Sequence, residues 1–281
     1  MSTSTSTSTT TSTTSTTITD AGIKVTQARV VKAEFLKVRT LRSTLYTLGI
    51  AVAAMSGIGI LICWTTANDW NNMRPRRQQR FNPLEDSLVG FHLAQLAIGV
   101  FGVLLIAGEY STGMIRSSLA AVPKRLPMLW AKVFVGAVVT FCVMLPSTLI
   151  TFFVSQRLLS VRHIQVSWST PNVPRTVIGV AMYLTVVVVL AIGLGALIRN
   201  VAGAIAALVG VLLVLPVIAL ALPQTWADRI NKFLPSNAGQ ALLGFTGDST
   251  QMTPWRGFAL FCGYAIGAIA ISAWLLRRRD A

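Results

Sequence analysis

Negatively charged residues are scarce in this sequence, which has nine aspartate and glutamate residues among 281. All charged residues together make up 12% of the chain, whereas a soluble globular domain usually carries about 25%. This deficit argues against an ordinary soluble globule, because such a domain covers most of its surface with charged and polar side chains.

Motifs for catalysis and ligand binding are missing as well. The chain contains no G-x-x-x-x-G-K-[ST] loop, which would cradle ATP phosphates, and no H-E-x-x-H or G-x-S-x-G sequence. Its three cysteines (Cys63, Cys142 and Cys262) have no C-x-x-C spacing. We therefore expect no enzyme activity, metal or cofactor on this chain, and we predict that the cysteines are small buried residues.

Apolar residues are abundant instead: they form 53% of the chain, and the mean hydropathy is +0.64. They gather in six runs, each near the ~20 residues that a membrane-spanning helix needs. The runs cover residues 43–66, 87–108, 132–154, 176–198, 201–222 and 255–276. The sequence thus predicts an all-α integral membrane protein, in which only Arg199 and Asn200 separate the fourth and fifth spans.

Two segments precede these runs. Residues 1–22 form a tail rich in serine and threonine, which we predict to be disordered, and they lack the pattern of a signal peptide. Residues 23–42 carry six cations and place Ala28, Val31, Phe35 and Val38 at helical spacing. This pattern predicts an amphipathic helix at the membrane interface that also touches a partner; the alternative is a plain basic flank of the first span.

The excess of positive charge, formally +15, reflects orientation in the membrane and contact with anionic lipid rather than nucleic-acid binding. If both termini are cytoplasmic, 14 lysines and arginines lie inside and 10 outside. Cytoplasmic loops of membrane proteins usually carry the excess of lysine and arginine. The arginines of residues 74–80 would lie outside and so depart from this positive-inside rule, and we interpret them as part of an external loop that meets anionic lipid or substrate.

Polar and small residues inside the runs suggest further roles. His92 and Gln95 lie one helical turn apart in the second run and are candidates for the substrate path, although neighbouring backbone or water satisfies such side chains more often. Small residues four apart, such as Gly263 and Gly267, predict close helix packing within the bundle or a dimer. Pro146 and Pro216 predict kinks.

The segment between the second and third runs is the most distinctive. Glu109 is followed by Gly113 and Arg116, then by Pro123-Lys124-Arg125, and finally by Lys132. This order resembles the E-x-x-x-G-[TM]-[IL]-R … P-x-R … K segment of type-2 ABC exporter permeases. Residues 33–42, with Glu34, Lys37, Arg39 and Arg42, and residues 233–242, containing Leu-Pro-Ser-Asn-Ala-Gly, are similar to two further stretches of that family.

The resemblance implies the roles of these segments. Residues 109–132 would hold a coupling helix that contacts an ATPase, residues 33–42 would form a connecting helix, and a short re-entrant helix would precede the last span. The alternative for residues 109–132 is a solvated loop with charges at the headgroups. The implied partners are two copies of an ABC ATPase, which would bind ATP and Mg²⁺, a second permease copy, identical or related, and membrane lipid.

The function expected from this resemblance is the permease subunit of an ATP-driven exporter in a bacterial plasma membrane. Because the runs contain almost no ionisable groups, the expected cargo is amphiphilic or lipophilic, such as a drug, a peptide antibiotic or a lipid. Two alternatives are a secondary transporter or channel, and a membrane scaffold or immunity protein that transports nothing.

Overall fold

The computed structural model describes residues 26–111, 113, 125–221, 223, 226, 229–245 and 252–278. Within these ranges the chain is helical and has no strand. The predicted tail (1–22) lies outside them, as do Arg116, Pro123 and Lys124 of the predicted coupling segment. The longer helices are α1 (Gln27–Thr40), α2 (Arg42–Asp69), α5 (Phe91–Ser111), α7 (Arg125–Leu159), α8 (Val173–Ile198), α9 (Val201–Val209) and α13 (Pro254–Arg278).

Six helical stretches are long and apolar enough to cross a membrane, which confirms the predicted number of spans. They cover Arg42–Asn72, Pro83–Ser111, Leu126–Arg162, Val173–Ile198, Val201–Ala219 and Pro254–Arg278. The third has 37 residues, about 55 Å at 1.5 Å per residue, and so exceeds the ~30 Å hydrocarbon core. The predicted run (132–154) covered only its middle, because the helix begins before Lys132 with the apolar residues 126–131 and continues after residue 154 through polar residues such as Gln156 and Arg157.

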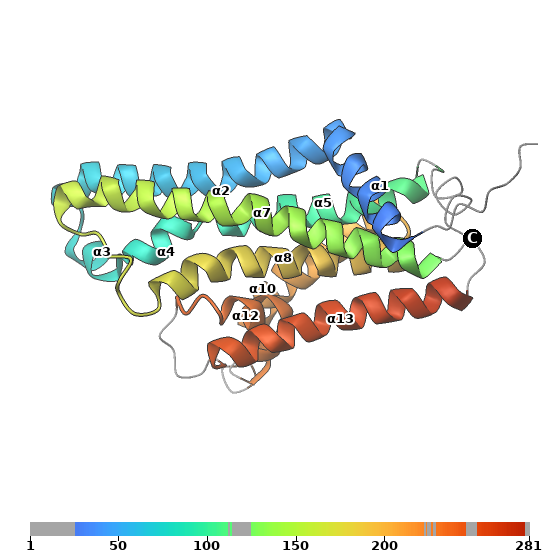
Figure 1. Cartoon of the computed structure of the whole chain (residues 1–281). Coiled ribbons are helices and arrows are strands. Elements are labelled where there is room, and N and C mark those ends of the chain that lie inside the picture. The colour runs from blue at the N-terminus through green and yellow to red at the C-terminus, as the bar shows by residue number, and fades with distance from the viewer. Residues whose placement is uncertain are drawn as a thin grey trace, which may run out of the picture.

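The six spans form a bundle whose two ends differ (Figure 1). Helix α1 and the last residues of α13 lie at one end, together with the end of α5 and the start of α7. Two short helices, α3 (Pro75–Arg80) and α4 (Pro83–Leu88), lie at the opposite end. The beginning and end of the described chain are therefore on the same side of the bundle, as an even number of spans requires.

The centre of the bundle is formed by α5 and α8. In the two spans that contain these helices, two thirds of the most apolar 18-residue stretch is buried, whereas the buried share in the fifth span is 17%. The two helices approach closely at Gly102, where a Cβ atom would lie 2.8 Å from the carbonyl oxygen of Val188. The Tyr183 hydroxyl donates a hydrogen bond of 2.6 Å to Gln95 Oε1 between the same helices. Close packing and buried hydrogen bonds of this kind hold membrane helices together.

Helices α2 and α7 are joined by hydroxyl groups. The hydroxyls of Ser56 and Ser147 are 3.2 Å apart, and Thr151 Oγ1 donates to Ser56 Oγ over 2.9 Å. Gly59 of α2 lies so close to α4 that an added Cβ would collide with the carbonyl oxygen of Ser87. This wall of the bundle thus depends on small and hydroxyl side chains.

The fifth span is interrupted before Pro216. It consists of α9, a π-helical turn (η3, Gly210–Val214) and α10 (Leu215–Leu220). Pro216 has no backbone N–H and its ring pushes on the preceding turn, and a π-turn is one of the usual ways in which a helix accommodates such a disturbance. By contrast, α7 continues through Pro146 as one helix.

The two connections around the last three spans fit the sequence pattern. Arg199 adopts a left-handed conformation (φ 56°) that ends α8, and Asn200 Oδ1 accepts a hydrogen bond from Gly203 N at the start of α9. The predicted tight hairpin is therefore present. Before α13, the short helix α12 (Pro235–Gln240) packs Gly239 against Tyr183, so that a short helix does precede the last span.

The prediction for the cysteines holds for one residue only. Cys63 is buried, Cys262 is half-buried and Cys142 is exposed on α7. An exposed thiol on an apolar helix faces lipid or another protein chain, and the apolar run alone does not distinguish these surroundings from the interior of the bundle.

Candidate functional site: a buried charge cluster

Helix α1 buries a face that is rotated from the predicted apolar stripe and shares only Val38 with it. Val30, Glu34 and Val38 are buried, whereas Phe35 of the predicted stripe is 48% exposed. The stripe therefore lies at the edge of the contact rather than at its centre. The reason is electrostatic, because Glu34 turns toward two ammonium groups, that of Lys132 on α7 and that of Lys37 on its own helix.

Lys132, near the start of the third span, is at the centre of this contact. Its Nζ atom donates hydrogen bonds to Glu34 Oε2 (2.8 Å), Glu109 Oε1 (2.7 Å) and the backbone carbonyl of Leu105 (2.9 Å). An ammonium group has three N–H donors, and here each has an acceptor. Only 1% of the Lys132 side chain is exposed, so these bonds replace its contacts with water completely.

Lys37 completes the buried charge cluster, which consists of Glu34, Lys37, Glu109 and Lys132. Its Nζ atom lies 2.9 Å from Glu34 Oε1 and 2.9 Å from Glu109 Oε1. Burial tends to lower the pKa of the Lys37 ammonium, but its hydrogen bonds to Glu109 and Glu34 outweigh burial and raise this pKa above its ordinary value. The cluster contains two positive and two negative charges and is neutral overall.

The cluster connects three elements that are far apart in the sequence. Glu34 and Lys37 belong to α1, Glu109 to the last turn of α5, and Lys132 to the first turns of α7. Removing one partner from a buried ion pair costs about 3–5 kcal/mol, because the remaining charge stays buried without compensation. The three helix ends are thus held in one arrangement, directly beside the connection from α5 to α7.

A pocket of about 240 Å³ lies next to the cluster. All four charged residues line it, together with Leu41, Ser43, Thr44, Leu104, Leu105, Gly108 and Ser111. Glu109 Oε2 is buried and has no hydrogen-bond partner among the described residues. The cluster therefore keeps one unused acceptor.

The other residues of the predicted coupling and connecting segments are not part of the cluster. Arg39 and Arg42 are exposed, and Gly113 has a left-handed conformation (φ 71°) with open space around it. Arg125 begins α7, but its side chain lies outside the described atoms. Neither the coupling nor the connecting role is tested by these positions.

The structure separates the two candidates for the substrate path. Gln95 is buried and accepts the hydrogen bond from Tyr183, while His92 is exposed and its ring packs beside Phe91. Gln95 thus acts as a link between α5 and α8. A role of His92 in transport stays a prediction.

Two participants at this end of the bundle were not foreseen. One is the Leu105 carbonyl, which accepts from Lys132 and has no signature in the sequence. The other is Arg199, whose guanidinium lies over the ring of Tyr110, 5.4 Å from its centroid. This cation–π contact joins the turn between α8 and α9 to the residue after Glu109. In the sequence, only the position of Tyr110 next to Glu109 could have drawn attention to this contact.

Comparison with known protein families gives one match. A family model described as ABC-2 family transporter protein covers residues 30–216, well over half of the chain. The chain belongs to the ABC-2 transporter family. The matched range contains all four members of the buried charge cluster, and no curated protein matches the chain at a significant level.

Membership of the ABC-2 family establishes the general role of the chain. It is the multi-pass membrane subunit of an ABC transporter, and such permeases generally pair with an ABC ATPase. The resemblance to this family is thereby confirmed, and the matched range includes residues 33–42 and 109–132 but not residues 233–242.

Proposed function

We propose that this ABC-2 permease is the membrane subunit of an ATP-driven exporter and that the buried charge cluster transmits movement from the ATPase to the spans. The observation that carries this proposal is the position of the cluster. It ties α1 to the end of α5 and the start of α7, the two helices that flank residues 112–124.

The proposed mechanism requires two membrane states that the ATPase distinguishes. A ligand shifts an equilibrium only by its differential affinity for the two states. ATP-driven closure of two ATPase subunits would press on residues 109–132, including Arg116, Pro123 and Lys124. Because Glu109 and Lys132 share hydrogen bonds with Glu34 and Lys37, this displacement would reach α1 as well as the second and third spans.

A second permease copy is proposed to complete the transport path. The fifth span is the least buried of the six, and apart from the glycine's own helix no atom of the described residues lies within 4 Å of a Cβ built on Gly210, Gly263 or Gly267. These surfaces are available for close contact with another helix. The proposal holds both for an identical copy and for a related permease.

The proposed cargo is amphiphilic or lipophilic, such as a drug, a peptide antibiotic or a lipid. Between Thr44 and Trp64 of the first span, and throughout Val201–Ala219, the sequence has no ionisable side chain apart from Tyr46 and Cys63. A strongly charged cargo would require counter-charges inside the membrane. The proposed site of action is a bacterial plasma membrane, with α1 on the cytoplasmic side.

The test uses the complete complex with its ATPase, co-purified in mild detergent and reconstituted in lipid. Glu109→Gln keeps the shape of the side chain but removes its charge, and we expect the complex to assemble while ATP hydrolysis falls severalfold. Glu85→Gln, a matched change at the other end of the bundle, should leave hydrolysis unchanged. Equal hydrolysis by the Glu109→Gln and wild-type complexes would refute the coupling role.

The two alternatives predict different results in the same preparation. A secondary transporter or channel would give flux through the isolated chain without ATP. A scaffold or immunity protein would give no flux with or without the ATPase. An ATPase that co-purifies and drives flux of an amphiphilic dye supports the exporter.

A further inference from the structure

A second pocket lies at the end of the bundle opposite α1. Its volume is about 750 Å³, and it is formed by the end of α2, the following turn η1 (Trp70–Asn72) and α3. The lining residues are Thr65, Thr66, Asp69, Asn72, Met73, Arg74, Arg76 and Arg77. Three arginines and one aspartate make this pocket distinctly positive.

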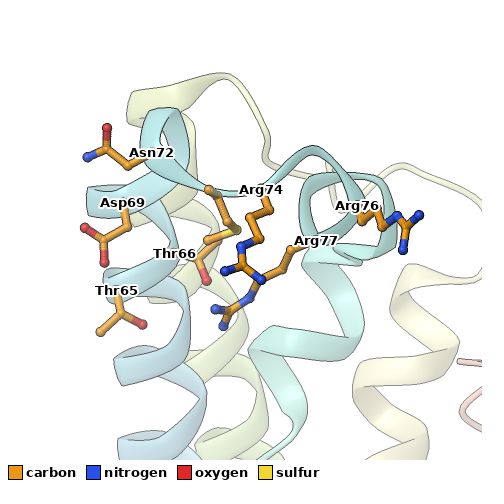
Figure 2. Close-up of a pocket in the computed structure, with 8 residues that line it drawn as sticks. Thr65, Thr66, Asp69, Asn72, Arg74, Arg76 and Arg77 are labelled. Carbon is orange, nitrogen blue, oxygen red and sulfur yellow. The ribbon is translucent and has the colours of Figure 1, made fainter.

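Figure 2 shows which of these side chains face one another. Arg74 and Arg77 extend from the α3 side toward Thr66 of α2, so that two guanidinium groups converge on one hydroxyl. Arg76 and Asp69 point away from this group. Arg74 and Arg77 therefore line the inner part of the pocket, whereas Asp69, the one acidic lining residue, faces away from it.

The two converging arginines lack acidic partners. Within the described part of the chain, neither Arg74 nor Arg77 forms an ion pair or a side-chain hydrogen bond. Arg77 interacts electrostatically with Asp86 but does not pair with it. Both arginines are exposed to solvent and line one pocket, so an anion that enters the pocket can accept charge-assisted hydrogen bonds from both guanidinium groups.

Thr66 supplies a neutral donor to the same pocket. Only 5% of the residue is exposed, but its hydroxyl keeps access to the pocket and has no hydrogen-bond partner among the described residues, whereas the hydroxyl of its neighbour Thr65 donates to the Ile62 carbonyl. The Thr66 hydroxyl is directed toward the two guanidinium groups and is free to donate to a bound anion.

The walls of this pocket are held in place by contacts away from the arginines. Gln78 Nε2 donates to the Trp70 carbonyl over 2.6 Å, and the rings of Trp70 and Phe81 meet edge to face with centroids 5.4 Å apart. Arg162 Nε donates to the Ala67 carbonyl over 2.9 Å and fixes the end of α2. Preorganised donors bind an anion with a smaller entropic cost.

The pocket lies at the depth of a lipid headgroup. Thr44, beside the buried charge cluster, precedes Thr66 by 22 residues, or about 33 Å along α2, which is close to the ~30 Å hydrocarbon core. The exposed aromatic residues Tyr46 and Trp64 are spaced as interface residues usually are. Thr66 and the arginines would thus meet the layer that contains the lipid phosphates.

We propose that Arg74, Arg77 and Thr66 form a binding site for a phosphate group, carried by an anionic lipid headgroup or by free phosphate. Guanidinium groups match the geometry of phosphate oxygens, and two of them with a hydroxyl can engage three oxygens of one tetrahedral anion, more than a carboxylate offers. The site also gives two of the four arginines of residues 74–80, Arg74 and Arg77, a function on the side of the membrane where the positive-inside rule does not favour them.

The test compares two probes with the purified full-length protein. Inorganic phosphate is titrated by calorimetry in neutral detergent, and retention of phosphatidic acid over phosphatidylcholine is measured by native mass spectrometry. Arg74→Gln/Arg77→Gln is expected to weaken binding of the preferred probe at least tenfold, since it removes both charge-assisted donors. Arg80→Gln, which removes one charge from the same helix outside the pocket lining, should change it less than about twofold.

Thr66→Val keeps the shape of the side chain and removes the hydroxyl, so it tests the site even if the double variant fails to fold. It is expected to weaken binding severalfold with an unchanged thermal midpoint. Binding of phosphatidic acid alone would support the lipid headgroup as source, and binding of inorganic phosphate would support a soluble anion. Equal binding by wild type, Thr66→Val and the double variant, or equal losses in Arg80→Gln, would overturn the proposal.

Discussion

The ammonium group of Lys132 donates three hydrogen bonds to two other helices: one to Glu34 of α1, and two to the side chain of Glu109 and the carbonyl of Leu105 in α5. With its own helix α7, one side chain thus joins three helices. Lys132 stabilises the fold by neutralising buried charges rather than by burying apolar area. Without its ammonium group, the carboxylates of Glu34 and Glu109 would have only Lys37 as a counter-charge.

Replacement of Lys132 by methionine is expected to destabilise the protein by about 3–5 kcal/mol, because Glu34 and Glu109 stay buried with only Lys37 between them. Denaturant unfolding in detergent measures this loss. Lys32→Met, an exposed position on α1, should change stability by less than about 0.5 kcal/mol.

The double variant Lys132→Met/Glu109→Gln removes one charge of each sign and restores neutrality. Its loss of stability should be smaller than the sum of the two single losses, as expected for partners in one network. Additive losses would show that the two residues act independently and would contradict the description of the cluster as a unit.

The sequence singled out the four members of the buried charge cluster but not their contact with one another. Glu34, Lys37, Glu109 and Lys132 were all identified from motif resemblance, whereas their mutual contact depends on the packing of three helices. The acceptor at Leu105 is a backbone carbonyl, and every residue carries one, so no sequence pattern distinguishes it.

Among the elements, the contact of α2 with α4 depends on the absence of a side chain at Gly59. A Cβ atom there would collide with the Ser87 carbonyl oxygen, whereas nothing lies within 4 Å of the corresponding position at Gly57. Position 59 of α2 therefore requires glycine, whereas position 57 of the same helix has room for a side chain.

Gly59→Ala is expected to destabilise the protein by about 1–3 kcal/mol, because backbone must move to accept the methyl group. Gly57→Ala should be neutral or stabilising by up to about 1 kcal/mol, since alanine favours a helix and has free space here. Thermal unfolding of the two variants in the same detergent checks both values. A larger loss for Gly57→Ala than for Gly59→Ala would contradict the described packing.

The short helices α3 and α4 were not predicted, although their signals are present. Pro75 and Pro83 occupy first-turn positions, and Asn82 Oδ1 accepts from the backbone N–H groups of Leu84 and Glu85. These are ordinary start signals. They were overlooked because a search for apolar runs treats the residues between two runs as a loop, whereas long spans are recognised by hydrophobicity alone.

For the whole molecule, the six spans place both ends of the described chain on one side, which we propose to be cytoplasmic. In a variant with Cys63, Cys142 and Cys262 replaced by alanine, a membrane-impermeant maleimide should label Gln79→Cys in intact cells and Thr26→Cys only after lysis. Both positions are exposed in the structure. The reverse pattern would show that the orientation is inverted.

Helix α7 extends without interruption from the buried charge cluster to the far end of the bundle, where Arg162, in the turn that follows it, bonds to the residue after Thr66. Its 35 residues span about 52 Å, and the part from Lys132 to Leu159 is about 40 Å long, so a tilt of about 5° around Lys132 would displace the distal tip by about 3.5 Å. The helix therefore has the proportions of a lever, and Pro146 is the point along it where bending is easiest. A tilt of α7 that starts at the buried charge cluster would in this way alter the spacing between Arg74, Arg77 and Thr66 on the other side of the membrane.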